Sequence, residues 1–512
     1  MDAPARHLLH RALQDRIAGS LVGSALGDAI GLYTEFLSAA QAAEAYPSRR
    51  FTLAGPDGRP TPFHPDYHRL PKEPGHWTDD TDHALLILLA FLHGADGTAA
   101  AASTNPSSPG LQGDHPPPLP TQRDLAERLR VWTRQGFPPL QTMPLGLGRL
   151  VGSVVSSSRF ATDPEAMARE AWERAGRQAA PNGSLMRTHA VGLICAVRGG
   201  GGAGVDGAGG GGDADGILRP RTAAAEAAAT AAVEPQDETE REVFAAAARL
   251  SRVTHVDPRC VVSCVVGTAL VRGVVRGEVR SGSDIDAVVA RCLAWFRAEG
   301  RVASDGDVDE AELWRHVKPD ETDGLEALRL DDEKAIGYVY KALGAGVVVL
   351  RTAMRREEEA EGRGFLVRTR VFEELITDLV LRGGDADTNA CFAGALLGGY
   401  LGYGALPDHW KHGLKHEGWL LGKAEALCRV LGVVEGGGDY VGKDDKDAEV
   451  YGGREPVTEA EMERRWMVLQ GEVASKMQEA AKGEAPKGRE PKAGPSWSLP
   501  WTSRGTSKRD AK

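Results

Sequence analysis

The chain has 512 residues, of which 42% are hydrophobic, and it is therefore long enough to bury a substantial core. Aromatic residues make up only 6% and glycine occurs 63 times, a composition that favours closely packed helices over a β-sandwich. The formal charge is −11, although the segment from Ala480 onward carries eight Lys and Arg against three Asp and Glu. An acidic body argues against a general nucleic-acid binder, because such proteins need basic surface to replace phosphate counterions.

Apolar residues recur at helical spacing along most of the chain, and few stretches alternate as strands do. Two apolar stretches, residues 15–36 and 390–406, repeat glycine at every fourth position. These glycines are Gly19, Gly23 and Gly27 in the first stretch and Gly394, Gly398 and Gly402 in the second. Because glycine adds no side chain to a helix surface, we expect two central helices whose backbones approach closely in an all-α fold.

Further helical patterns lie between and after these two stretches. They cover residues 83–92, a stretch from 121, 243–253, 260–278, 283–299, 332–353, 371–381, 417–432 and 457–480. Residues 97–120 and 198–242 are low-complexity segments rich in Ser, Pro, Gly or Ala, and we interpret both as insertions. We predict one compact, orthogonal helical domain over residues 1–480, followed by a disordered basic tail over 481–512.

The 390–406 stretch also requires a membrane interpretation to be weighed, because it has no charged residue over 17 positions. Five of these positions are glycine, and Asp385 and Asp387 come directly before them, which favours a buried helix of a soluble protein. The N-terminus has no apolar leader, and the six cysteines contain no CxxC pair. We therefore expect a cytoplasmic or nuclear monomer that binds neither membranes nor nucleic acid.

The first cluster of polar residues that could carry chemistry is Thr78-Asp79-Asp80-Thr81-Asp82, where a loop enters an apolar helix. Thr and Asp are preferred at helix starts, so capping alone could explain part of this pattern. Three carboxylates in five residues exceed what capping requires. Hydroxyl and carboxylate oxygens are the ligands that hard cations such as Mg²⁺ prefer.

A second cluster, Asp385-Ala386-Asp387-Thr388, again opens an apolar helix, and the preceding Gly383 and Gly384 permit a tight loop. Capping could explain one of its carboxylates. Two Thr/Asp clusters at the starts of two apolar helices are more simply explained as the two halves of a metal site.

Three other segments carry candidate residues. Glu35 follows the first glycine-faced helix, and its carboxylate could be functional or merely exposed to solvent. The turn at Asn182-Gly183-Ser184 runs into a helix, whose free backbone N–H groups suit phosphate or ribose oxygens, although an ordinary Asn-Gly turn is the alternative. His255 lies in a loop before an apolar helix, where a histidine can equally be structural.

Together these five segments resemble the ADP-ribosylglycohydrolase family, which includes dinitrogenase-reductase-activating glycohydrolase and the ADP-ribosylhydrolases. The resemblance extends over about residues 15–430. Its specific marks are GDAIGLYTE at 27–35, WTDDTDHALL at 77–86, PNGSLMR at 181–187, THVDPRC at 254–260 and GGDADTNA at 383–390. The segment IGYVYKALGAG at 336–346 is similar to a structural helix of that family.

The resemblance implies a helical bundle of the ADP-ribosylglycohydrolase type that holds two Mg²⁺ or Mn²⁺ ions. The implied metal ligands are Thr78, Asp79, Asp80, Asp385, Asp387 and Thr388. Glu35 and Asp80 would be catalytic, Asn182, Gly183 and Ser184 would line the ADP-ribose groove, and His255 would lie near its phosphates or ribose. The implied activity is hydrolysis at the distal ribose C1 of an ADP-ribosylated protein, through Ser or Arg, or of a small ADP-ribose conjugate.

The chain departs from the family at one position that concerns the substrate. Many arginine-directed members carry an aspartate in a DIG segment where this chain reads Gly146-Leu147-Gly148-Arg149. This departure puts arginine-linked ADP-ribose in doubt, and it leaves Glu35 to take more of the proton chemistry. The alternative to an enzyme is an inactive, ADP-ribose-binding or crystallin-like structural protein of the same fold.

Overall fold

The computed structural model describes residues 3–55, 58–95, 117–197, 235, 237–302, 306–320, 324–361, 368–434 and 440–483. Within these ranges the chain forms helices and three isolated bridges, but no strand. The predicted all-α class is therefore confirmed. Most of the two predicted insertions and nearly all of the predicted tail lie outside the described residues.

The α-helices of the described residues follow the order of the apolar patterns, and they include some, such as Pro164–Arg174 and Glu310–Val317, that no pattern predicted. They are α1 (Ala3–Gly31), α2 (Ala39–Ala45), α3 (Asp79–Gly94), α4 (Gln122–Gln135), α5 (Arg149–Val155), α6 (Pro164–Arg174), α7 (Thr188–Ile194), α9 (Glu238–Ser251), α10 (Pro258–Arg276), α11 (Gly282–Trp295), α12 (Glu310–Val317), α13 (Val339–Glu361), α14 (Arg368–Val380), α15 (Ala386–Leu401), α16 (Asp408–Lys411), α17 (Glu417–Val430) and α18 (Glu459–Gly483). Short 3₁₀ turns are η1 (Leu185–Arg187), η5 (Glu326–Leu328), η6 (Tyr403–Ala405) and η7 (Lys446–Ala448), and η3 (Phe296–Gly300) is a π-turn.

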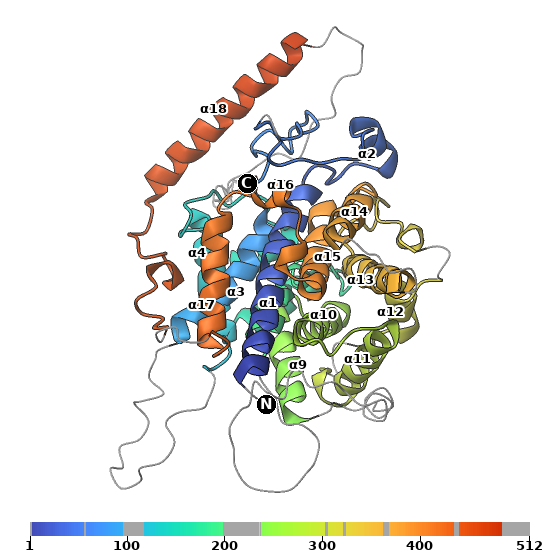
Figure 1. Ribbon diagram of the computed structural model, residues 1–512. Coiled ribbons are helices and arrows are strands. Elements are labelled where there is room, and N and C mark those ends of the chain that lie inside the picture. Colours follow the sequence, from blue (N-terminus) through green and yellow to red (C-terminus); the bar gives the residue numbers. More distant parts are fainter. Residues whose placement is uncertain are drawn as a thin grey trace, which may run out of the picture.

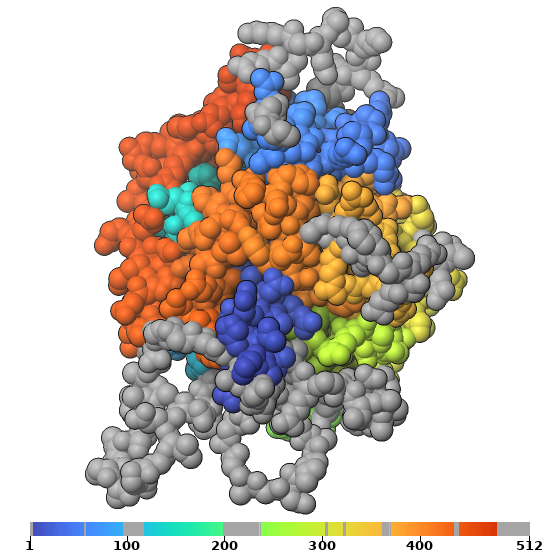
Figure 2. Space-filling model, in the orientation of Figure 1, coloured from blue at the N-terminus to red at the C-terminus, as the bar shows by residue number. Residues whose placement is uncertain are grey.

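Helix α1 runs through the middle of the bundle, with α3, α4 and α17 on one side and α10 to α13 on the other (Figure 1). Helix α18 extends away from this body. In the space-filling view, the orange segment that includes α15 to α17 covers the centre of the face, and only the dark-blue start of α1 reaches the surface (Figure 2). The second half of α1, from Ile17 onward, is accordingly almost entirely buried.

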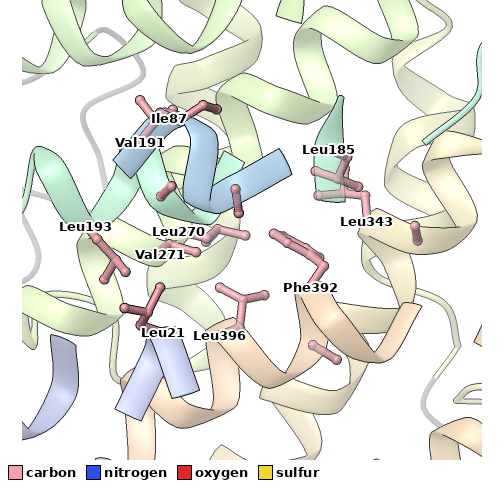
Figure 3. Packing of buried hydrophobic residues seen from close by; sticks show 14 of the residues in the cluster. Leu21, Ile87, Leu185, Val191, Leu193, Leu270, Val271, Leu343, Phe392 and Leu396 are labelled. Carbon is pink, nitrogen blue, oxygen red and sulfur yellow. The ribbon is translucent and has the colours of Figure 1, made fainter. Parts of the chain in front are cut away.

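The core forms where α1, α3, α7, α10, α13 and α15 meet. Figure 3 shows side chains from all of these helices and from η1 packed together, among them Leu21, Ile87, Leu270 and Phe392. Helix α10 is long and apolar enough to cross a membrane, but 94% of its apolar window is buried inside the protein. Its composition is therefore that of a core helix.

The predicted close approach of two glycine-faced helices is confirmed for α1 and α15. A Cβ atom added to Gly27 would lie 1.9 Å from the carbonyl oxygen of Ala390, and one added to Gly23 would lie 2.5 Å from that of Gly394. Gly402, which the pattern placed on the same face, instead ends α15 with a positive φ of 89°. The two helices therefore touch along their backbones and can be separated only by disrupting the centre of the fold.

The same contact joins the end of α1 to the start of α15. Gly31 lies against the backbone of Ala386, so the two helices are antiparallel. Beyond α1, the N–H of Phe36 donates to the carbonyl of Gly384 over 2.6 Å, and the N–H of Gly384 donates to the carbonyl of Leu37 over 2.8 Å. These bonds fix the turn that carries Glu35 beside the loop that opens α15.

Several helix starts differ from the expected positions, since α1 begins at Ala3 instead of near residue 15 and α13 begins at Val339 instead of residue 332. Helix α3 begins at Asp79 instead of residue 83, so its carboxylates occupy the first helical turn. Helix α9 begins at Glu238, inside the segment interpreted as an insertion, because Asp237 accepts a hydrogen bond from the N–H of Glu240 and caps it. Apolar periodicity alone does not reveal such polar first turns.

Candidate active site at the starts of three helices

Glu35 lies beside the carboxylates that open α15. One oxygen atom from each of Glu35, Asp385 and Asp387 lies within 4.8 Å of one from each of the other two. Asp385 occupies the N-cap position of α15 but makes no side-chain capping bond, so its carboxylate is available for other contacts. The structure thus brings together residues that are 350 positions apart in the chain, and it places Glu35 closer to the predicted metal ligands than the sequence indicated.

The start of α3 supplies the second half of this acidic cluster. Thr78 caps the helix, since its hydroxyl accepts a hydrogen bond from the N–H of Asp80, and the capping interpretation is confirmed for this residue. Asp28, from α1, accepts hydrogen bonds from the N–H groups of Thr78 and Thr81 and from the Thr81 hydroxyl at 2.6 to 3.1 Å. That Asp28 binds the first turn of α3 could not be predicted from the sequence, because its partners lie 50 to 53 residues away.

Asp82, the third carboxylate of this segment, has a different environment. It accepts one hydrogen bond from the indole of Trp77 and one from the indole of Trp132, each at 2.8 Å. Burial raises its pKa to about 6, although both indole N–H groups act in the opposite direction. Asp82 therefore ties α3 to α4 and leaves Asp79 and Asp80 for chemistry.

The acidic cluster has the properties of a cation site. Burial raises the pKa of Asp79, Asp80 and Asp387 well above their usual range, and neighbouring carboxylates raise them further. The Oδ1 atom of Asp80 is buried and has no hydrogen-bond partner. Carboxylate and hydroxyl oxygens packed together in this way suit a hard divalent cation, whose charge would offset their mutual repulsion. The residues therefore fit the metal that the sequence predicts.

Thr388 completes the ligand set that the sequence proposed. It lies in the first turn of α15, is buried, and donates its N–H to Asp387 over 2.9 Å. Its side chain also favours the charged form of Asp80. All six proposed ligands therefore lie at the starts of α3 and α15. The carboxylates at one helix start raise the pKa of those at the other.

Glu35 is held by basic residues from the loop before α3. His68 Nε2 lies 2.5 Å from Glu35 Oε2, and the ring of His68 packs against Phe36 with 4.9 Å between centroids. Burial by itself would raise the pKa of Glu35, but the charges of His68 and Lys72 outweigh it and lower the pKa to about 2. Glu35 is thus ionised at neutral pH, whereas burial raises the pKa of the aspartates around it.

Arg69 fixes the backbone of the same turn. This fully buried side chain donates to the carbonyl oxygens of Leu32 and Tyr33 at 2.8 and 3.1 Å, donates to that of Glu35, and pairs with Asp66. It therefore satisfies carbonyl groups of the turn that follows α1. Sequence reasoning missed His68, Arg69 and Lys72, because this loop shows neither periodicity nor a motif.

The turn at residues 181–184 lies next to the acidic cluster. The amide of Asn182 donates from Nδ2 to Asp385 Oδ2 over 2.9 Å, which places this predicted substrate residue directly on a predicted metal ligand. The N–H groups of Leu185 and Met186 bond to the carbonyl of Asn182, so they are not free as the helix-start argument assumed. Ser184 is fully buried and its Oγ accepts from Ser251 and Cys264, so a role for it in substrate binding stays a prediction.

His255 packs against this turn, with its Nε2 atom 3.3 Å from the position that a Cβ on Gly183 would take. Thr254 Oγ1 accepts a hydrogen bond from Arg187 over 2.8 Å and lies 2.7 Å from His255 Nδ1. Burial, and then the charge of Arg187, lower the pKa of His255 well below its usual range, so the ring is neutral. Its Nε2 atom is buried and has no hydrogen-bond partner.

Gly146, at the departure from the DIG pattern, lies against the acidic cluster. Its φ is 97°, and a Cβ atom there would lie 2.0 Å from Asp79 Oδ1. A side chain at this position would collide with a predicted metal ligand. The position at which this chain lacks the aspartate therefore lies at the acidic cluster itself and not on a distant surface.

Comparison with known proteins agrees with this site. No curated protein matches the chain. A solved structure described as an "ADP-ribosylglycohydrolase-related protein complex" is 21% identical, covers 82% of this chain and 99% of its own, and gives a TM-score of 0.42. The family described as ADP-ribosylglycohydrolase matches residues 9–203 and 200–436, which include every candidate site residue. The chain therefore belongs to the ADP-ribosylglycohydrolase family of hydrolases.

Proposed function

We propose that the protein is a metal-dependent enzyme that releases ADP-ribose from a modified protein side chain or a small ADP-ribose conjugate. The observation that carries this proposal is the meeting of Glu35, Asp385 and Asp387 within 4.8 Å, beside the buried Asp79 and Asp80. Four buried carboxylates and the half-buried Asp385 in one place destabilise a protein unless a cation offsets them. Such a cluster therefore favours a working metal site over a purely structural role.

The residues that would hold two Mg²⁺ or Mn²⁺ ions are Thr78, Asp79, Asp80, Asp385, Asp387 and Thr388. When bound, such ions polarise a ribose oxygen and make water a better nucleophile. Glu35 is ionised and held by His68, so its carboxylate is suited to accept a proton from the attacking water. Asp80 presents a buried oxygen without a partner toward the cluster.

Asn182, Gly183, Ser184 and His255 form the proposed wall for the ADP-ribose moiety. Thr254 Oγ1 has one hydroxyl hydrogen and accepts from Arg187, so we infer that it donates to His255 Nδ1. The proton of the neutral ring is then on Nε2, beside Gly183. This fixed donor is suited to a phosphate or ribose oxygen, each of which can accept a hydrogen bond.

Gly146 supports a preference for O-linked ADP-ribose. Because Gly146 carries no side chain where it lies against Asp79, the aspartate that many arginine-directed relatives carry is absent from this part of the site. We therefore propose that serine-linked ADP-ribose is cleaved faster than arginine-linked ADP-ribose, with Glu35 as the residue that manages the proton.

The test measures ADP-ribose release by mass spectrometry from serine-, arginine- and acetyl-linked substrates, with Mg²⁺, with Mn²⁺ and with EDTA. We expect release with metal, little with EDTA, and the highest rate on the serine linkage. Tight ADP-ribose binding without any turnover, unchanged in Asp387→Ala, would support the inactive binding protein instead. Faster cleavage of the arginine linkage would contradict the role assigned to Gly146.

The cellular setting is a further part of the proposal. All six cysteines are buried and free, which supports a reducing compartment such as the cytoplasm or nucleus. The proposed binding partner is an ADP-ribosylated protein. We also propose that the enzyme itself is a monomer. Light scattering of the purified chain tests the monomer, and a dimer mass at micromolar concentration would contradict it.

A further inference from the structure

The outer face of α4 carries three arginines that line a hollow on the protein surface. At 100° per residue, Arg130 and Arg134 lie within about 20° of Arg123 around the helix axis, and Trp132 lies about 180° away. The hollow has a volume of about 320 Å³. Its walls are formed by Arg123, Glu127, Arg130, Val131, Arg134, Gln135, Ala161, Thr162 and Tyr451.

This arginine hollow is separate from the active site. Trp132, on the inner face of α4, donates to Asp82 of α3, so the acidic cluster lies behind α3 on the other side of the helix. No residue of the hollow belongs to the candidate active site. A ligand in the hollow would therefore bind independently of the metal and of Asn182.

The walls of the hollow are fixed by hydrogen bonds. Arg128, which is buried, donates to the carbonyl oxygens of Ala448 and Glu449, and the N–H of Val457 donates to Gln135 Oε1 over 3.0 Å. These hydrogen bonds, two from Arg128 and one to Gln135, attach the segment that carries Tyr451 to α4. The hollow is therefore a preformed feature and needs little ordering when a ligand enters.

The three guanidinium groups lack acidic partners. Elsewhere on the surface, Arg159 pairs with Glu170 at 3.0 Å and Arg429 pairs with Glu425 at 2.7 Å. Among the described residues, no carboxylate lies within 4.0 Å of the guanidinium nitrogens of Arg123, Arg130 or Arg134, and Glu127 is the one acidic residue in the hollow's wall. The net positive charge stands out in a chain whose formal charge is −11.

We propose that the arginine hollow binds a phosphate-bearing anion. Guanidinium groups bind phosphate oxygens in a bidentate manner, and three of them can neutralise a doubly or triply charged group. The hydroxyl of Tyr451 is a further polar group of the wall, whereas the Thr162 hydroxyl donates its hydrogen to the carbonyl oxygen of Arg159. A volume of 320 Å³ is at the small end of ligand sites, which suits a diphosphate or a phosphorylated side chain better than a whole dinucleotide.

The test measures binding of inorganic pyrophosphate to the full chain by isothermal titration calorimetry, with EDTA present so that the acidic cluster holds no metal. Pyrophosphate should bind at micromolar to low millimolar concentration, and the double variant Arg130→Gln, Arg134→Gln should weaken it at least tenfold. Arg130→Lys, which keeps the charge but loses the bidentate geometry, should fall between the two. Arg159→Gln is the matched surface control and should bind as the wild type does.

Two further arms identify the source of the phosphate and the location of the site. Binding of a phosphoserine peptide, but not of its serine form, would indicate a phosphorylated protein, while binding of pyrophosphate alone would indicate a small molecule. Asn182→Ala should leave pyrophosphate binding unchanged. Equal binding in the double variant, loss of binding in Asn182→Ala, equal competition by sulfate at matched ionic strength, or no binding to either probe would overturn the proposal.

Discussion

Two different kinds of structure hold the side chains around Glu35. On one side, Asp385 and Asp387 stand on a helix whose backbone is packed directly against α1, through glycines that leave no space between them. On the other side, His68 and Lys72 come from a loop, and the buried Arg69 beside them is what joins this loop to the end of α1. Packed helices place the carboxylates, and the loop lowers the pKa of Glu35 most strongly, while its Lys72 also favours the charged form of Asp79.

This division suggests separate roles for the two regions. The helix starts gather negative charge that a cation can offset, whereas the loop supplies positive charge, with His68 acting on Glu35 and Lys72 acting on both Glu35 and Asp79. Changes on the helix side should therefore affect metal binding or the fold itself. Changes on the loop side should affect the protonation of Glu35 and leave the metal bound.

The largest effect is expected from the helix side, in Asp387→Asn. Replacing this ligand should lower the rate of ADP-ribose release by more than about 100-fold, since even outer partners of metal ligands are worth 10- to 100-fold. Because burial and neighbouring carboxylates raise the pKa of Asp387, the neutral side chain should also raise the melting temperature of the metal-free protein.

Metal titration by calorimetry and thermal unfolding with EDTA check both parts of this prediction. Asp408→Asn is the control, because that carboxylate is exposed and pairs with Lys411 on the surface. A variant that binds metal as tightly as the wild type would show that Asp387 is not a ligand.

The helix contact itself can be tested with Gly27→Ala. The added methyl group would lie 1.9 Å from the carbonyl oxygen of Ala390, so the two helices must move apart. We expect a loss of about 3 kcal/mol in the free energy of unfolding, the upper range for overpacking a core.

Gly422→Ala is the matched helical control. No atom lies within 4 Å of a Cβ at that position of α17, so this change should stabilise the protein by about 0.5 to 1 kcal/mol. Urea unfolding of both variants gives the comparison. Equal stability of the two would mean that the backbones of α1 and α15 are not in contact.

The loop side is tested by His68→Ala. Glu35 should lose the partner that lowers its pKa, and we expect ADP-ribose release at neutral pH to fall about tenfold while metal affinity stays the same. The acid limb of the pH profile for kcat/KM should move to higher pH. His64→Ala, in the same loop, is the control.

Stability gives a second readout for the same variant. The folded pKa of Glu35, about 2, lies below its ordinary value of 4.5, so its interaction with His68 stabilises the protein above pH 4.5. This stabilisation is lost as the pH falls toward 2. The metal-free wild type should therefore lose more stability than His68→Ala over that range, and parallel curves would contradict the pairing.

The two regions also differ in how far the sequence predicts them. Glycines at every fourth position of two apolar stretches predicted the α1–α15 contact, because helical periodicity is local and places known residues on one face. The same contact brings Glu35 close to Asp385. This proximity depends on the antiparallel register of α1 and α15, so neither segment alone could predict it. The capping residue of α3 was predictable for the same local reason, whereas Asp385 stands at the start of α15 without a side-chain capping bond.

His68, Arg69 and Asp28 were not predictable in this way. Each acts on residues 33 to 53 positions away through a single side chain, and such contacts leave no periodic trace in the sequence. The turn motif also did not reveal that the Ser184 side chain is buried against Ser251 and Cys264, because such a motif does not tell which side chain enters the core. Tertiary contacts between a loop side chain and a distant residue are thus the part of a site that cannot be predicted from a single sequence.

The smallest expected effect concerns His255, in the proposed wall for ADP-ribose. It comes from removing the contact of the Thr254 hydroxyl with His255 Nδ1. In Thr254→Val the side chain keeps its shape but can neither accept from Arg187 nor hold His255 Nδ1. The proton of the imidazole ring is then no longer confined to Nε2, and we expect ADP-ribose to bind three- to tenfold more weakly, which is about 0.7 to 1.4 kcal/mol. KM should rise by the same factor and kcat should change little, because His255 faces the substrate wall and not the acidic cluster. Thr254→Ser keeps the hydroxyl and should bind as the wild type does. If Val and Ser bind alike, the Thr254 hydroxyl does not set the proton position of His255, and the ring contacts ADP-ribose by shape alone.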